Sequence, residues 1–155
     1  MPHAVIDGVP VSQSLAIVRV LARKAGIEGK TDADFAKSEM LIEECNDIFS
    51  AMGKAMYPPS GVEGRPAAFA EFFGAGGACA KHLASLEKLL ANGRFTTTTT
   101  TGELAVVAII CCIKELKHTS EFLAATPGIA AFFAAREEAA NAALANLGVY
   151  FKTTA

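Results

Sequence analysis

The feature that most constrains the fold of this 155-residue chain is the apolar run LAVVAIICCI at positions 104–113. The run is about half as long as a bilayer requires, so it predicts a helix inside a protein core rather than a transmembrane segment. A helix that is apolar on nearly every side must be covered on every side. We therefore expect residues 104 to about 117 to form the central helix of one domain.

Further helices are predicted on both sides of this run. Thr31 is typical of an N-cap with acidic Asp34 at the third position, and apolar residues recur at helical spacing as far as Met56. YPPSGVEGRP, at 57–66, ends that helix. Residues 67–91 predict one long helix, in which the GAGGACA patch at 74–80 indicates a kink or a close-packing site. Residues 129–148 predict the last helix, followed by a short surface tail at 149–155.

A run of threonines at 96–101 precedes the apolar helix. Its β-branched side chains disfavour helix, so we expect an extended connector there. At the end of the run, Thr100 and Glu103 have the spacing of a capping box, in which each side chain binds the backbone amide of the other residue. The sequence therefore predicts that the central helix begins directly after the threonines.

The chain begins with a β-hairpin signal followed by a helix. Apolar residues at 4–6 and 9–11 flank Asp7-Gly8, a dipeptide that suits the positive φ angles of a tight hairpin turn. Helical spacing starts at Leu15 and stops at Gly26. A lone hairpin is marginally stable in water, so this segment should need cover from elsewhere.

Composition excludes several functions. The net charge is −2 and the 14 basic residues are scattered, which argues against a nucleic-acid surface. The first residues lack the pattern of a signal peptide, and no run is long enough for a transmembrane segment. The three histidines are too isolated to predict a metal site.

The cysteines favour a reducing compartment, and the sequence leaves the organelle unknown. We interpret them as buried free thiols, because free cysteine behaves as a small hydrophobe. A catalytic thiolate is the alternative, although no histidine stands at a suggestive spacing. The residues concerned are Cys45, Cys79, Cys111 and Cys112.

Three stretches resemble the cytosolic glutathione transferases of the sigma, mu, pi and alpha group. VSQSLAIVRVLA, at 11–22, is similar to the family pattern L-x-Q-S-x-A-I-x-R-x-L-A, and it follows Pro2 and the Asp7-Gly8 turn. EMLIEECNDIF, at 39–49, resembles the first helix of the family's helical domain, and the late stretch at 126–147 resembles F-P-x-L-x-x-F-x-x-R. The threonine run departs from the family, because the usual Gly-Asp is absent there.

The resemblance implies a mainly α fold in two parts. Residues 1–28 would be a remnant of a thioredoxin-like domain, and residues 29–155 would be the all-helical domain of the glutathione transferases. The β-α-β half that carries the family's catalytic tyrosine or serine has no counterpart in the sequence. That hydroxyl stabilises the glutathione thiolate, which is the nucleophile. We therefore expect an N-terminally truncated member that is not catalytic as it stands.

The resemblance also implies part of a glutathione site. Gln13 and Ser14 match the pair that holds the γ-glutamyl end, and a helix start does favour a carboxylate. Pro2 matches the family's cis-proline, and Met1 matches the residue whose backbone pairs with the cysteinyl part. Asp47 matches the acid that reaches the glutathione of a neighbouring subunit. The alternatives are a simple helix cap at Ser12 or Ser14 and a solvated helix charge at Asp47.

Two functions remain open from the sequence. In the first, the chain is a non-catalytic structural or interaction subunit of a larger assembly, in which another polypeptide or a second copy covers residues 1–25. In the second, it is a glutathione S-transferase whose N-terminal half is missing from this sequence. No cofactor is required in the first case, and glutathione would be at most a weak ligand.

Overall fold

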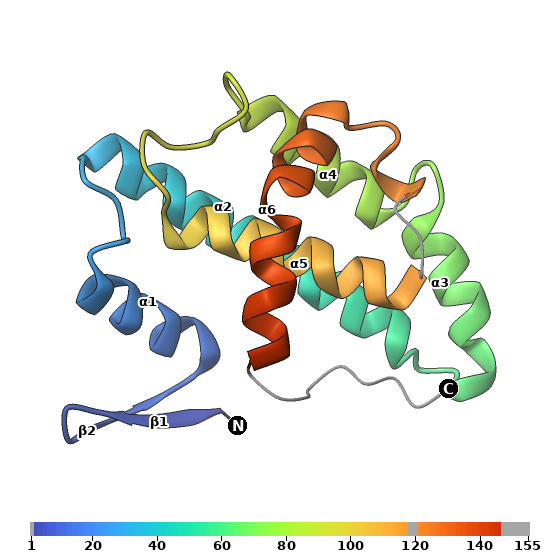
Figure 1. Ribbon diagram of the computed structural model, residues 1–155. Helices are drawn as coiled ribbons and strands as arrows, with labels where there is room; N and C mark the ends of the chain where they lie inside the picture. The colour runs from blue at the N-terminus through green and yellow to red at the C-terminus, as the bar shows by residue number, and fades with distance from the viewer. Residues whose placement is uncertain (1, 118–120, 147–155) are drawn as a thin grey trace.

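The computed structural model describes residues 2–117 and 121–146, most of which are helical (Figure 1). The hairpin strands β1 (His3–Ile6) and β2 (Val9–Ser12) lead into α1 (Ser14–Ala25). The remaining helices are α2 (Asp32–Met56), α3 (Arg65–Phe73), α4 (Ala78–Leu89), α5 (Thr101–Lys117) and α6 (Pro127–Asn146), with short 3₁₀ turns η1 (Val62–Gly64) and η2 (Glu121–Leu123). The mainly α fold expected from the sequence is confirmed.

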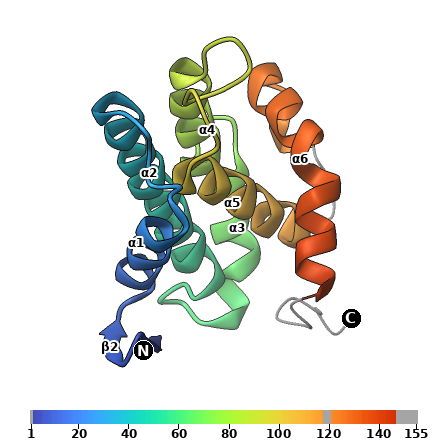
Figure 2. The ribbon, with the colours of Figure 1, turned by 60° about the vertical axis from the view of Figure 1, so that its left-hand side comes forward.

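Helix α5 lies in the middle of the helical bundle, as its sequence predicts. Figures 1 and 2 both show it between α2 and α6. Val106, Ile110 and Ile113 are completely buried, and they belong to one continuous apolar core that also includes residues of α2, α4 and α6. The prediction that α5 is covered on every side is wrong. Leu104 is 47% exposed and Ala108 is exposed, because neighbouring helices leave one stripe of its surface open.

The single helix predicted over residues 67–91 is also wrong, because the chain forms α3 and α4 with a turn at 74–77 between them. At Gly77, a Cβ atom would collide with the backbone carbonyl oxygens of Glu71 and Phe72. The chain therefore turns back on the end of α3 more closely than any residue with a side chain would allow. The glycine patch therefore separates two helices completely and does not merely kink one helix.

The threonine run connects α4 to α5 without forming a helix, but the prediction that it is extended is wrong, because the chain bends at residues 95–98 and Thr101 already begins α5. Two buried carboxylates hold the run. Asp34, in the first turn of α2, accepts hydrogen bonds from the backbone amide of Thr97 (2.9 Å) and from the Thr97 hydroxyl. Glu103 makes only half of the predicted capping box. Its amide donates to Thr100 Oγ1 (3.4 Å), whereas its carboxylate turns to the amides of residues 95 and 96. That carboxylate satisfies amides of the connector that have no helical partner.

The hairpin and α1 form as predicted and lie at one side of the bundle (Figure 1). Asp7 and Gly8 have φ angles of 52° and 80°, and Gly26 ends α1 in the left-handed conformation. Ala22 is the one residue of α1 that is fully buried. The predicted end of the last helix at Gly148 and the tail at 149–155 lie outside the described residues, as does His118. The domain boundary at residue 28 stays a prediction.

Candidate functional site

The start of α1 is the first candidate site. Gln13 occupies the N-cap position, and no side chain caps the helix there. The Gln13 amide donates to the Pro2 carbonyl (3.2 Å), and the Ile17 amide donates to the Gln13 carbonyl (3.0 Å). The amides of residues 14–16 lie in the first turn, where the helix itself provides no carbonyl group to accept their hydrogen bonds. This geometry suits a carboxylate, which helix N-termini favour through both hydrogen bonding and the helix dipole.

Gln13 has an unusual backbone conformation, with φ 76° and ψ 128°. Residues other than glycine seldom adopt a positive φ, and they retain it where the surrounding structure enforces it, often at binding sites. Here the enforcing contacts are the hydrogen bond to the Pro2 carbonyl on one side and the first turn of α1 on the other. The sequence marks Gln13 only through the family resemblance, because glutamine, unlike glycine, asparagine or aspartate, gives no signal of a positive φ.

Starts of several other helices are satisfied from within the chain. Thr31 Oγ1 accepts from the Asp34 amide (3.1 Å) at α2, and Thr100 does the same for α5. At α6, the Glu87 carboxylate accepts from the amides of Gly128 and Ile129 (both 2.8 Å). Helices α1, α3 and α4 have no side-chain cap. Glu87 thus demonstrates, within this chain, how a carboxylate binds at a helix start.

The side chains of the predicted glutathione site are spread over two elements. Ser14 is exposed, and within the described part of the chain its hydroxyl has no hydrogen-bond partner, so the simple cap reading of Ser14 is wrong. Asp47 is exposed on α2, and no hydrogen bond or ion pair joins it to Gln13 or Ser14 among the described residues. Pro2 is exposed, and Met1 lies outside the described residues. The glutathione roles of all five residues stay predictions.

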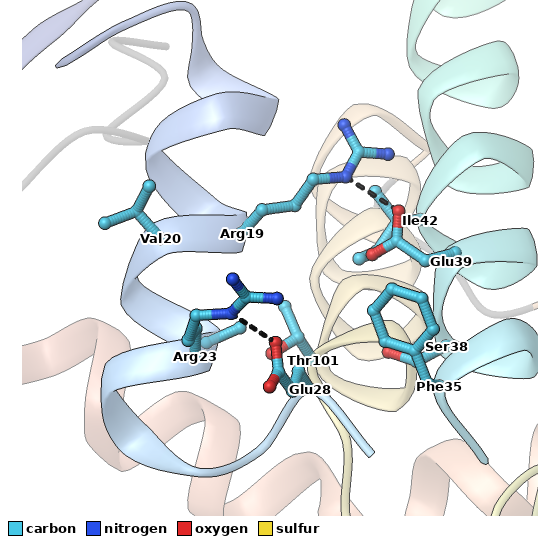
Figure 3. Close-up of a pocket in the computed structure, with 10 residues that line it drawn as sticks. Arg19, Val20, Arg23, Glu28, Phe35, Ser38, Glu39, Ile42 and Thr101 are labelled. Carbon is cyan, nitrogen blue, oxygen red and sulfur yellow. Dashed lines mark hydrogen bonds and ion pairs between the residues drawn. The ribbon is translucent and has the colours of Figure 1, made fainter. Parts of the chain in front are cut away.

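A pocket of about 250 Å³ separates α1 from α2 (Figure 3). Arg19 crosses it to bind Glu39 (Nε–Oε2 2.8 Å) and also pairs with Glu43 on α2. Both carboxylates raise the pKa of Arg19, with Glu43 contributing most. The lining residues are Arg19, Val20, Ala22, Arg23, Glu28, Phe35, Ser38, Glu39, Ile42 and Thr101. None of the predicted site residues lines this pocket, which lies beside the second half of α1 and away from its start.

These ion pairs, together with a backbone hydrogen bond from Thr101 to Ile27 (2.9 Å), fasten α1 to the bundle. This role was not predicted from the sequence. The available signal was spacing, because Glu39 and Glu43 stand four residues apart and so share one face of a helix. Spacing alone cannot tell an inter-helix contact from a solvated face.

A larger cleft, of about 1080 Å³, runs between α2 and the α3–α4 pair. His82 Nδ1 and Glu44 Oε1 meet there at 2.9 Å, and Lys54 and Lys81 stand at its edge. Small residues line most of the remaining wall, including the glycines at 74, 76 and 77. The glycine patch is evident in the sequence, but the cleft was not predicted from it, because the depth of the cleft depends on how two helices diverge.

Three of the four thiols are poor nucleophiles at neutral pH, because their pKa is raised. Burial raises the pKa of Cys45 to about 12, and it also raises the pKa of Cys111 and Cys112. Cys45 and Cys79 are buried thiols that form no disulfide, as predicted, whereas Cys111 and Cys112 are only partly buried. In the described part of the chain, no three His, Cys, Asp or Glu side chains gather as a metal site would require. None of the described helices combines the length and apolar content needed to cross a membrane.

Comparisons with known proteins identify the fold. No protein-family model matches the sequence, and no curated protein matches it. Among solved structures, the chain is similar to a pi-class glutathione S-transferase of Onchocerca volvulus, at 24% identity and a TM-score of 0.66, over 81% of this chain and 59% of that one. It is also similar to prostaglandin synthase D of Nilaparvata lugens, at 19% identity and a TM-score of 0.70, over 86% of this chain and 66% of that one.

The chain therefore has the glutathione-transferase fold that its sequence predicts, and it spans less than two thirds of either matched structure.

Proposed function

We propose that this chain, which has the fold of the glutathione transferases, acts as a non-catalytic interaction subunit whose residues 2–25 are covered by another polypeptide. The observation that carries the proposal is the exposure of large apolar side chains on this segment. Val5 is 69% exposed, Val9 59% and Leu21 49%. The described chain supplies no further element that covers them.

The strand register assigns the side chains of β1 and β2 to two faces of the hairpin. Ile6 pairs with Val9 and Ala4 with Val11, so these four side chains share one face. Three of them, all except Val9, are half-buried on the side that α1 contacts. The opposite face consists of His3, Val5, Pro10 and Ser12, and all four are exposed. We name these four residues the outer face.

Covering the outer face would be energetically worthwhile. Fully burying one valine side chain contributes roughly 1.5–3 kcal/mol, and a two-stranded hairpin by itself is marginal in water. Val5 and Pro10 are directly opposite each other across the strands, so one partner surface would bury both together. The outer face is therefore a suitable contact for a partner with an apolar surface.

The test is the native size of the full-length chain, expressed with a tag in the cells from which it comes. Val5→Asp places a charge on the outer face, and Ala84→Asp places the same charge on an exposed position of α4 as a matched control. We expect the wild type and the control to migrate within a larger assembly, and Val5→Asp to migrate as the free 16.1 kDa chain with unchanged helical circular dichroism. A wild-type chain that migrates alone would contradict the proposal.

One observation favours a second function, the binding of glutathione, which the resemblance to the glutathione transferases also implies. The start of α1 combines uncapped amides, the enforced positive φ of Gln13 and the exposed Ser14 hydroxyl. We propose that a glutathione γ-glutamyl carboxylate binds there, through the amides of the first turn and the Ser14 hydroxyl. These residues supply binding only, and the thiolate-stabilising hydroxyl of a transferase would have to come from another segment.

Calorimetric titration with glutathione tests the second function. Because the contacts are few, we expect a dissociation constant near 1 mM, about −4 kcal/mol, and no conjugation of a general electrophile above the uncatalysed rate. Ser14→Ala should weaken binding by several-fold, whereas Ser50→Ala, an exposed serine on α2, should leave it unchanged. Tight binding that ignores Ser14→Ala would refute this assignment.

A further inference from the structure

The hydroxyl groups of the threonine run at 96–101 have different surroundings in the fold. Four of the six take part in hydrogen bonds that hold the connector or the start of α5, and they belong to Thr96, Thr97, Thr100 and Thr101. The Thr98 side chain is half-buried. Thr99 is exposed, and its Oγ1 accepts a hydrogen bond from Arg94 Nη2 (3.3 Å), whereas its proton has no acceptor among the described residues. Thr99 therefore carries a hydroxyl that is both exposed and not donated to another group.

Arg94, whose side chain is 43% exposed, has unused hydrogen-bond donors. Its Nη2 donates to Thr99 and to the Glu103 carboxylate (3.3 Å in each case), while its Nε has no hydrogen-bond partner among the described residues. A guanidinium presents five N–H donors in a rigid fork that matches the oxygens of a phosphate group. A phosphate attached to Thr99 would therefore lie next to an arginine that is already in place and not fully used.

The start of α5 also favours negative charge at this position. Thr100 acts as the N-cap, because its Oγ1 accepts from the Glu103 amide (3.4 Å), and Thr99 is the residue directly before it. The positive end of the helix dipole lies at this terminus, where a phosphate is stabilising. This attraction is secondary to that of Arg94, because the first three amides of α5 already have acceptors.

We propose that Thr99 is a phosphorylation site and that Arg94 binds the phosphate once it is attached. A protein kinase would transfer the γ-phosphoryl group of a nucleoside triphosphate to Thr99 Oγ1. The new P–O bond forms as the bond between the γ-phosphorus and its bridging oxygen breaks, the nucleoside diphosphate leaves, and a base of the kinase takes the hydroxyl proton. The inference does not depend on the proposed function, because it involves no residue of the hairpin or of α1.

The nearest carboxylate keeps other partners when Arg94 turns towards the phosphate. Glu103 Oε2 also lies 3.7 Å from Arg136 Nη2, and Glu103 Oε1 accepts from two amides of the connector. Asp34, the other carboxylate that holds the connector, has its own hydrogen-bond donors. The phosphate would therefore gain the attraction of Arg94 without leaving a buried carboxylate unpaired, and it should stabilise the connector.

Thr97 provides a matched control in the same run. It is exposed like Thr99, but its hydroxyl donates to the Asp34 carboxylate. A phosphate on Thr97 would lose that hydrogen bond and would place two like charges side by side. Phosphorylation should therefore destabilise the protein at Thr97 and stabilise it at Thr99.

Full-length chains with phosphothreonine incorporated at one position during translation test the effect, with urea unfolding as the measurement. Relative to the unmodified chain, we expect phosphothreonine at position 99 to raise the urea midpoint by about 0.5 M at about pH 7.5. The gain should be smaller at about pH 5, because the second pKa of the phosphate is near 6 and its charge is lower there. Phosphothreonine at position 97 should lower the midpoint.

Arg94→Gln, measured with and without phosphothreonine at position 99, tests the role of the arginine. The substitution should remove most of the gain, and a gain that it leaves unchanged would overturn the assignment of Arg94. The pH dependence in the wild-type background tests the same charge interaction without altering Arg94. A lowered midpoint for phosphothreonine at position 99, or an equal effect at positions 97 and 99, would overturn the inference.

The modification itself is tested on the tagged full-length chain, purified with phosphatase inhibitors from the cells in which it occurs. Trypsin cleaves after Arg94 and Lys114, so the peptide 95–114 contains the whole threonine run. We expect fragmentation of this peptide in the mass spectrometer to locate a phosphate on Thr99, and Thr99→Val to abolish it. Absence of phosphate from the wild-type peptide, or its location on Thr97 instead, would overturn Thr99 as the site.

Discussion

Replacing Glu103 with alanine should be among the most destabilising single changes in this protein. Its side chain is 1% exposed, and Oε1 accepts from the backbone amides of Phe95 (3.1 Å) and Thr96 (3.4 Å). Its Oε2 lies 3.3 Å from a guanidinium nitrogen of Arg94 and 3.7 Å from one of Arg136. One carboxylate therefore joins the connector, the start of α5 and helix α6.

The magnitude follows from the groups that would be left without partners. Each buried amide that loses its acceptor costs about 1–3 kcal/mol, whereas the side chains of Arg94 and Arg136, 43% and 25% exposed, keep access to water and add little. With two amides left without an acceptor, we expect Glu103→Ala to lower the free energy of unfolding by about 2–6 kcal/mol. Glu103→Gln retains one carbonyl oxygen for the Phe95 amide and should lose less, about 1–3 kcal/mol.

Urea unfolding followed by far-ultraviolet circular dichroism measures this change, because the chain has no tryptophan. At a slope of about 2 kcal/mol per M, a loss of 4 kcal/mol lowers the midpoint by about 2 M. Glu115→Ala, an exposed glutamate on the same helix, is the control and should stay within about 0.5 kcal/mol of wild type. If Glu103→Ala also stayed within about 1 kcal/mol of wild type, the reasoning about the stranded amides would be refuted.

Three further outcomes are expected. Hydrogen bonds from the threonine run lower the pKa of Asp34, so its stabilisation is present above about pH 4 and is lost as the pH falls through the lowered value. Asp34→Asn should therefore reduce the urea midpoint at pH 7 by an amount that shrinks as the pH falls below about 4, and a constant difference would contradict this. Gly102→Ala should destabilise the protein by about 1–3 kcal/mol, because the new Cβ would lie 2.5 Å from the Ser38 carbonyl oxygen. Gly53→Ala, with open space around it, should stabilise the protein by about 0.5–1 kcal/mol. If thermal unfolding showed the two substitutions to change stability in the same direction, the argument would be refuted. Cys45, with its pKa raised to about 12, should react with a thiol reagent at pH 8 only after unfolding, and rapid reaction in the native state would contradict its burial.

Local features of this fold could be predicted from the sequence because short-range physics decides them. The Asp7-Gly8 turn, the left-handed Gly26 and the Thr31 cap each depend on residues within a few positions of one another. The same holds for the connector, since β-branched threonines disfavour helix wherever they stand together. The resemblance to the glutathione transferases rests on such local signals in their order along the chain, and the comparison with solved structures confirmed the fold.

Other features depend on how segments pack against one another, and only the tertiary structure decided them. The amide partners of Glu103 lie in the preceding connector, and the partner of Asp34 stands 63 positions away. The break at Gly77 exists because α4 begins against the end of α3, which periodicity cannot register. Leu104 is exposed although its run is apolar throughout.

At the candidate site, the sequence indicated Gln13 and Ser14 as the residues at the helix start, and the structure added the enforced φ of Gln13. The exposed face of the hairpin also required the structure, because the pairing of Val5 with Pro10 decides which side chains share that face. Residue types determine which conformations each position can adopt. Which of a residue's backbone groups and faces remain open depends on pairing and packing between segments, and those are properties of the folded chain alone.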